Sequence, residues 1–245
     1  MMSKVFITIT IGAGLLLLPA LLTLVCHWHW QENQLTSLNY FFYLCTQTVT
    51  RPWGMITSLL LAGCLYCFRD CRAGHPILLV LVMLIGVAGG QAMKSLLKPH
   101  FAEPRPYVVG IMKELRQPAE FFYQQSKAQR QQIIRHAAAS WPKIPPWQLA
   151  HWQNETGFSF PSGHSLFVAS WVLLFYGLVN VKRYWPVLIV VTLWAWAVMW
   201  SRLLLGMHWP QDLIASVVLA WFISVFLLIL YRRHCENRSQ NNFFQ

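Results

Sequence analysis

The chain has 245 residues, of which 56% are hydrophobic, 15% aromatic and only 11% charged, and its mean hydropathy is +0.42. About a quarter of the residues in soluble domains are charged, so this composition excludes an ordinary soluble domain and predicts an integral membrane protein. The formal net charge is +11, but the basic residues are scattered at the ends of apolar segments. They therefore indicate orientation in a membrane and contact with lipid headgroups, and they argue against nucleic-acid binding.

Six apolar segments have roughly the length needed to cross the hydrocarbon core of a bilayer. In chain order they cover about residues 5–26, 53–68, 76–97, 165–181, 184–205 and 211–231. The first resembles a signal peptide, but its apolar run is unusually long and no small-residue cleavage site follows it. We interpret it as an uncleaved helix. The predicted fold class is an all-α integral membrane protein with six transmembrane helices, forming a single domain over residues 1–245.

The positive residues orient these six segments. In a six-span arrangement, one side carries most of the cations of the short loops and the termini: Lys4, Arg69, Arg72, Lys182, Arg183, Arg232, Arg233 and Arg238. The short loops on the other side carry Arg51 and Arg202. The positive-inside rule then places both termini in the cytoplasm.

A long polar segment, about residues 98–164, separates the third and fourth apolar segments. Within it, Ser126 and Gln129 have the spacing of a capping box at the start of a helix. Apolar residues nearby form one candidate stripe: Phe121, Phe122, Ile133, Ile134, Ala137 and Trp141. We expect an outer insertion, about residues 107–160, with one or two amphipathic helices lying on or near the membrane surface.

Three polar clusters lie at the outer ends of the apolar segments. They are KPHFAEPRP at 98–106, FPSGHS at 160–165 and SRLLLGMHWPQDL at 201–213. Their candidate functional residues are Lys98 and Arg105, then Ser162, Gly163 and His164, and finally Arg202, His208 and Asp212. Because the six-span arrangement places all three clusters on the non-cytoplasmic face, we expect them to form one site.

The first two clusters predict a site for an oxyanion. Arginine forks match phosphate oxygens, and lysine adds a point charge. The sequence PSGH is typical of a helix start, with Ser162 as a candidate cap, and free N–H groups at a helix start bind anions. The only acidic residues evident near the three cations are Glu103 and Asp212.

The third cluster adds a candidate nucleophile. If Pro210 opens the last helix, Asp212 can accept a hydrogen bond from Nδ1 of His208 and leave Nε2 free to attack. His164, when protonated, can give a proton to a departing alkoxide. These groups suffice for phosphoryl transfer, so we expect no metal and no cofactor. Four neighbouring residues stay without a role: Lys94, His100, Glu103 and His151.

Metal sites are the main structural alternatives. A zinc site of His164, His208 and Asp212 is disfavoured because three flanking cations would repel a dication. Three cysteines are spaced like a metal cluster, but they end an apolar run and no second pair follows, so we interpret them as small hydrophobic side chains: Cys64, Cys67 and Cys71. A disulfide between Cys26 and Cys45 stays open.

Together the clusters resemble the three signatures of type 2 phosphatidic acid phosphatases. The matching residues are Lys98 with Arg105-Pro106, the run PSGH at 161–164, and Ser201-Arg202 with His208 and Asp212. The family includes lipid phosphate phosphatases, glucose-6-phosphatase and vanadium haloperoxidases. The resemblance implies a phosphohistidine at His208 oriented by Asp212, and His164 as the acid for the leaving group. It also implies that five residues hold the phosphate: Lys98, Arg105, Ser162, Gly163 and Arg202.

The length, the large insertion and the tryptophan-rich segments resemble a bacterial subgroup of lipid phosphatases. The resemblance implies a place in the bacterial inner membrane, with the active site facing the periplasm. The implied substrates are phosphatidylglycerol phosphate, undecaprenyl pyrophosphate, phosphatidate and diacylglycerol pyrophosphate, which belong to phospholipid synthesis and lipid carrier recycling. The expected partners are these lipids and the bilayer, with no nucleic acid and no obligate protein partner.

Two other functions stay open from the residues alone. A vanadate-dependent haloperoxidase would use the same anion pocket, but such enzymes are soluble and six apolar segments argue against one. A lipid-phosphate transporter would use the cations only for binding and would not need His208 paired with Asp212.

Overall fold

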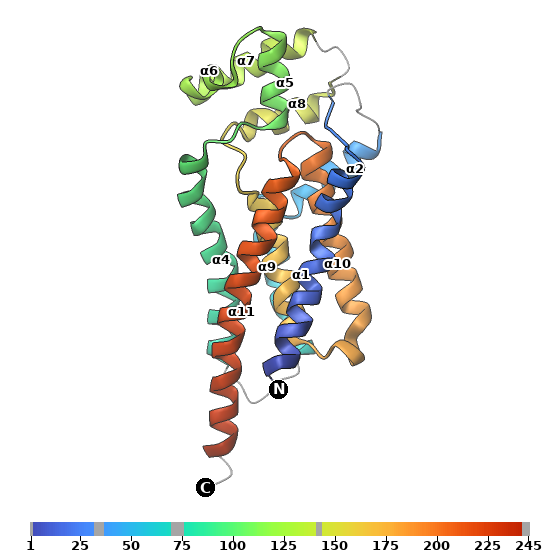
Figure 1. The fold of residues 1–245 in the computed structure, drawn as a ribbon, viewed down its shortest axis with the longest axis vertical. Helices are drawn as coiled ribbons and strands as arrows, with labels where there is room; N and C mark the ends of the chain where they lie inside the picture. The colour runs from blue at the N-terminus through green and yellow to red at the C-terminus, as the bar shows by residue number, and fades with distance from the viewer. Residues whose placement is uncertain (1, 32–36, 70–75, 141–143, 242–245) are drawn as a thin grey trace.

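The computed structural model describes residues 2–31, 37–69, 76–140 and 144–241. The regular elements in these ranges are all helices (Figure 1), and the described residues contain no β-strand. In chain order they are α1 (Met2–Val25), α2 (Ser37–Gln47), α3 (Trp53–Phe68), α4 (Pro76–Phe101), α5 (Pro106–Glu114), α6 (Ala119–Gln124), α7 (Lys127–Ser140), α8 (Pro146–Asn154), α9 (Gly163–Leu178), α10 (Val181–Leu204) and α11 (Pro210–Asn241). The predicted all-α class is confirmed.

The six predicted apolar segments coincide with α1, α3, α4, α9, α10 and α11. Four stretches are long and apolar enough to cross a membrane: Ser3–Val25, Ile77–Glu114, Val181–Leu204 and Pro210–Cys235. Helices α3 and α9 are apolar but have 16 residues each, which corresponds to about 24 Å of helix. The hydrocarbon core of a bilayer is about 30 Å thick, so these two helices are short for a span.

Helix α9 lies at the centre of the bundle. Every side chain from Ser165 to Leu178 is buried, and the helix packs against α1, α4, α10 and α11. A helix that is apolar on all sides is stable only when it is enclosed. The position of α9 therefore explains an apolar sequence without a polar face.

The outer helices expose large apolar side chains. Leu59 on α3 is 75% exposed, Leu96 on α4 is 74% exposed, and Val190 on α10 is 65% exposed. Apolar surface of this extent is rare on soluble monomers. It fits contact with lipid, so the chain is a multi-pass membrane protein.

Helices α5 to α8 form a cap at the end of the bundle opposite the two termini (Figure 1). The cap has its own buried core, in which Tyr107 and Trp152 stack with ring centroids 4.9 Å apart. Leu205 and Met207, from the connection between α10 and α11, are buried in the same core. The Leu205 carbonyl also accepts hydrogen bonds from Trp152 Nε1 (2.9 Å) and Gln148 Nε2 (3.1 Å). The cap thus fixes the connection that carries His208.

The predicted capping box is present at the start of α7. The Ser126 backbone N–H donates to Gln129 Oε1 (2.9 Å), and the Gln129 N–H donates back to Ser126 Oγ (3.4 Å). The apolar stripe, by contrast, largely faces the protein. Three of its members are buried in the core of the cap: Phe122, Ile134 and Ala137. Phe121 is 40% exposed, and Trp141 lies outside the described residues. Phe122, Ile134 and Ala137 thus fill the interior of the cap and are not available to a membrane surface.

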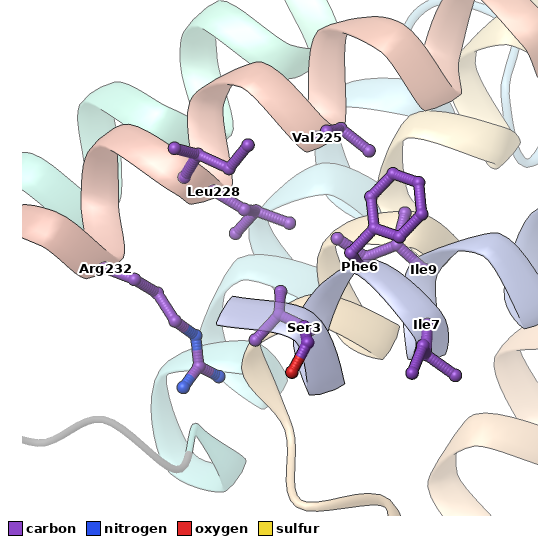
Figure 2. Close-up of a pocket in the computed structure, with 9 residues that line it drawn as sticks. Ser3, Phe6, Ile7, Ile9, Val225, Leu228 and Arg232 are labelled. Carbon is purple, nitrogen blue, oxygen red and sulfur yellow. The ribbon is translucent and has the colours of Figure 1, made fainter. Parts of the chain in front are cut away.

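A separate apolar cavity of about 450 Å³ lies between α1 and α11, near the two termini (Figure 2). Phe6, Val225 and Leu228 are among its lining residues, and Arg232 lies at its edge. The guanidinium of Arg232 donates to the Gly177 carbonyl at the end of α9 (2.9 Å). This cavity is at the opposite end of the bundle from the three polar clusters.

Candidate active site

The three polar clusters meet where the bundle joins the cap. Lys98 is in the last turn of α4 and Arg202 in the last turn of α10, whereas His164 and Asp212 are in the first turns of α9 and α11. Arg105 directly precedes α5. Antiparallel helices bring the end of one next to the start of another, so residues far apart in sequence converge here.

His208 and Asp212 form a buried pair. His208 Nδ1 lies 3.1 Å from Asp212 Oδ2, and the two residues are 2% and 0% exposed. Pro210 is the first residue of α11, which places Asp212 one turn below His208. A carboxylate at Nδ1 holds the ring proton there and leaves the lone pair on Nε2.

The surroundings keep His208 uncharged. Burial lowers the pKa of His208 well below its usual value, and the nearby charges of Arg105 and Arg202 lower it further. Since the folded pKa lies below the ordinary value, the imidazole is neutral at pH 7. A neutral imidazole with a free Nε2 is the form that attacks an electrophile.

Arg105 and Arg202 are fixed cations beside this pair. Arg202 is fully buried and donates to Thr46 Oγ1 on α2 (2.8 Å). Arg105 is 4% exposed and donates to the carbonyls of Gly157 (2.7 Å) and Met207 (3.1 Å). Guanidinium forks held in this way are preorganised for a planar or tetrahedral oxyanion.

Glu155 occupies the space between the two arginines. Its carboxylate accepts two hydrogen bonds from Arg202 Nη2, at 2.9 and 3.0 Å, and lies 3.3 Å from Arg105 Nη2. His164 Nε2 and His151 Nε2 lie 4.0 and 3.9 Å from it. The expectation that only Glu103 and Asp212 would be near the cations was therefore wrong. Glu155 follows α8, and only the folded cap brings it to the site.

The charge state of the Glu155 cluster is well defined. Burial alone would raise the pKa of Glu155, but Arg202, His164 and Arg105 together hold it well below its usual value, so the carboxylate is ionised. Burial lowers the pKa of His151 to about 4, so this imidazole is neutral. His151 therefore serves the site as a neutral hydrogen-bond partner, 3.2 Å from Arg202 Nη1.

The start of α9 is built as the PSGH run predicts. Ser162 is the N-cap, and its Oγ accepts from the Ser165 N–H at 3.3 Å. A Cβ added to Gly163 would lie 2.6 Å from Cδ of Lys94, so glycine allows the lysine to pass close to the backbone. His164 Nε2 lies 3.2 Å from Thr50 Oγ1.

The lysines of α4 support the loop before α9. Lys98 Nζ donates to the carbonyls of Phe158 and Ser159. Lys94 Nζ donates to Gln91 Oε1 (2.8 Å), and the same Gln91 side chain donates to the Gly163 carbonyl (2.9 Å). Lys98 therefore lies against the backbone that leads into the PSGH run, and Lys94 lies against Gly163 within the run.

Glu103 and His100, which the sequence left without a role, lie in different surroundings. Glu103 accepts from Gln211 Nε2 (3.0 Å) at the edge of the site, whereas His100 is exposed and packs edge-to-face against Phe101. The contacts that sequence reasoning missed come from Thr46, Thr50, His151, Glu155 and Ser159. None of these belongs to a recognisable motif. The single available signal was an isolated acidic residue, Glu155, shortly before PSGH in a strongly basic chain.

The structure describes most of the cysteines that were considered as a disulfide pair or as metal ligands. The thiols of Cys26 and Cys45 are free, as are those of Cys64 and Cys67. Cys71 lies outside the described residues. Over the described ranges, no three His, Cys, Asp or Glu side chains are grouped so that they could hold a metal ion.

Known proteins match most of this chain. A model of the PAP2 superfamily matches residues 77–235. Phosphatidylglycerophosphatase B of Escherichia coli (strain K12) is 38% identical over 226 residues, which cover 92% of this chain and 89% of that protein. The protein of the same name from Haemophilus influenzae is 35% identical over 211 residues, covering 84% of this chain and 87% of that protein.

Proposed function

The chain belongs to the PAP2 superfamily and is a phosphatase, and on that premise we propose that it hydrolyses lipid phosphates through a phosphohistidine at His208. One observation carries the proposal. A neutral imidazole, oriented by Asp212, lies beside two fixed arginines at one end of an apolar helix bundle. A lipid phosphate can place its headgroup there while its acyl chains stay in the bilayer.

The proposed substrates are lipids with a terminal phosphate or diphosphate. They are phosphatidylglycerol phosphate, undecaprenyl pyrophosphate, phosphatidate and diacylglycerol pyrophosphate. The names of the two relatives specify the first of these for those proteins. On this basis we assign the chain to phospholipid synthesis; its assignment to lipid carrier recycling rests on the resemblance of its motifs to the family.

Phosphate binding uses the positive groups of the site. Arg105 and Arg202 would hold two of the phosphate oxygens through their Nη2 groups, and Lys98 would add a third cation. Ser162 and Gly163 lie at the start of α9, where the helix dipole favours an anion; the Ser162 N–H points to the Asp212 carbonyl at 3.5 Å. These groups also stabilise the negative charge that builds up on the phosphoryl oxygens in the transition state.

The chemistry then proceeds in two steps. Nε2 of His208 attacks phosphorus, and His164 donates a proton to the departing oxygen, so that the bond between phosphorus and this oxygen breaks and the lipid alcohol or lipid phosphate leaves. Burial lowers the pKa of His164 well below its usual value in the free protein, so this step requires the negative charge of the bound phosphate to raise that pKa and protonate His164. Water next attacks phosphorus and His164 takes a proton from that water, while the bond between phosphorus and Nε2 breaks and inorganic phosphate leaves His208 free. Asp212 stabilises the positive charge that His208 acquires when it is phosphorylated.

The proposal is tested by phosphate release from the purified chain in detergent. We expect hydrolysis of long-chain phosphatidate to continue in excess EDTA, because the side chains alone supply the charges and the proton. Vanadate should inhibit, since its trigonal bipyramidal form resembles the phosphoryl transition state. Binding of lipid phosphate without release would support the transporter alternative. Complete loss in EDTA with recovery on adding zinc would contradict the metal-free mechanism.

We also propose six spans, with both termini in the cytoplasm and the active site facing the periplasm of a bacterial inner membrane. Single cysteines at positions 100 and 154, both exposed, should react with a membrane-impermeant maleimide in intact spheroplasts of a cysteine-free variant. A cysteine at exposed position 182 is the matched control and should react only after lysis. The reverse labelling pattern would overturn the orientation.

A further inference from the structure

The carboxylate of Glu155 lies where the proposed mechanism needs the substrate phosphate. Both arginines assigned to phosphate binding direct their Nη2 groups at it, at 2.9–3.3 Å. The proposed acid, His164, is 4.0 Å from the same carboxylate. A phosphate cannot take both forks while Glu155 holds them.

This arrangement follows from the cost of buried charge. Two guanidinium groups that are 0% and 4% exposed would repel each other without an anion between them, and an unpaired buried charge is strongly unfavourable. Glu155 provides the anion in the free protein. Any ligand must therefore supply more favourable interactions with the two arginines than this carboxylate does.

The position of Glu155 allows it to leave. It stands between the end of α8 and the start of α9, and its side chain is 23% exposed, whereas both arginines are enclosed. Gly157, two residues further on, is exposed, and a Cβ there would meet nothing within 4 Å. The carboxylate can thus turn towards solvent by rotation of its own side chain, while the backbone of this loop keeps its hydrogen bonds from Tyr107 and Arg105 and the arginines stay in place.

We propose that Glu155 is a resident competitor for the phosphate pocket and that it sets a charge threshold for substrates. The proposal rests on the function proposed above, since it takes the arginines as phosphate ligands. Displacing the carboxylate lowers the apparent affinity of every ligand by the same factor. Doubly charged terminal phosphates and diphosphates still bind, whereas the singly charged phosphodiesters of ordinary phospholipids fall below useful affinity. The site is then kept free of the bulk lipids that surround it.

The test measures binding to the purified full chain by isothermal titration, with inorganic phosphate at pH 8 and dimethyl phosphate as the doubly and singly charged probes. Glu155→Gln keeps the shape of the side chain but removes its charge. We expect both probes to bind roughly ten- to a hundredfold more tightly, the usual worth of a charge-assisted hydrogen bond. Phosphatidylglycerol in mixed micelles should become an inhibitor of phosphatidate hydrolysis by this variant.

Two further variants separate displacement from a general effect of charge. Glu155→Asp keeps the charge but is too short to bridge both arginines, so phosphate should again bind more tightly. If Glu155→Gln does not fold, Glu155→Asp alone tests whether the carboxylate competes with phosphate. Glu120→Gln removes an exposed carboxylate on α6 and should leave both affinities unchanged within about twofold. Phosphate affinities in a folded Glu155→Asp variant that equal or fall below those of the unmodified chain would overturn the proposal. Failure of the phosphatase function itself would show separately, as absence of phosphate release despite this binding pattern.

Discussion

Replacing His208 with alanine is expected to lower the turnover of every lipid phosphate by about 10⁶, the loss seen when a catalytic nucleophile is removed. The side chain is 2% exposed, and its Nδ1 is held by Asp212 at 3.1 Å, so Nε2 is the atom left to attack phosphorus. Without this atom no covalent intermediate can form. Phosphate binding should persist in the variant, because the arginines keep their own contacts with Thr46, Gly157 and Met207.

The measurement combines steady-state phosphate release with rapid quenching of radiolabelled substrate. The unmodified chain should yield a phosphoprotein that is stable in base and labile in acid, as expected for a phosphohistidine, and His208→Ala should yield none. His136→Ala is the matched control, because His136 is exposed on α7 and makes no part of the site. Near-normal activity of His208→Ala would mean that another group is the nucleophile.

The helices of the bundle could be predicted from the sequence because apolar runs and local start signals determine them. The run at 53–68 coincides with α3, and Pro210 begins α11 as its position suggests. Ser162 caps α9, which fits the general preference for serine at that position. Apolar patterns alone do not decide whether α3 and α9 cross the membrane, because enclosure by other helices also accounts for a short apolar helix. For α9 the structure shows that enclosure.

The contacts around the arginines could not be predicted, because they join distant segments. Arg202 meets Thr46, 156 residues away, and Glu155, 47 residues away. These pairings depend on how α2 and α8 pack, and neither helix carries a sequence motif that identifies its partner. The same limitation applies to the apolar residues of α6 and α7. Their spacing identifies one face, but only the packing of the cap shows that Phe122 is turned inwards.

The second large expected effect is that of replacing Asp212 with asparagine, and it follows from the hydrogen bonds of this carboxylate. Three donors converge on Asp212 Oδ2: His208 Nδ1, the Trp209 N–H (3.0 Å) and the Ser159 hydroxyl. The other oxygen, Oδ1, is buried and has no hydrogen-bond partner. In Asp212→Asn the amide oxygen can therefore take the place of Oδ2 and keep all three donors, while the NH₂ group points to the site of Oδ1. The proton then stays on Nδ1 of His208, and the variant loses only the negative charge.

We therefore expect Asp212→Asn to lower kcat by roughly 10²–10³, the range for one electrostatic contact to a developing charge. A wrong tautomer, as in a Ser-His-Asp triad with the same change, would cost about 10⁴, so the magnitude distinguishes the two causes. The measurement is kcat for long-chain phosphatidate, together with the ¹⁵N shifts of labelled histidine, which report the protonated ring nitrogen. Ser159→Ala is the control for loss of a single donor and should cost at most about tenfold, since it removes one hydrogen bond and no charge. A 10⁴-fold loss with Nε2 protonated would show that the asparagine turns its NH₂ group towards His208, against the preference of the three donors.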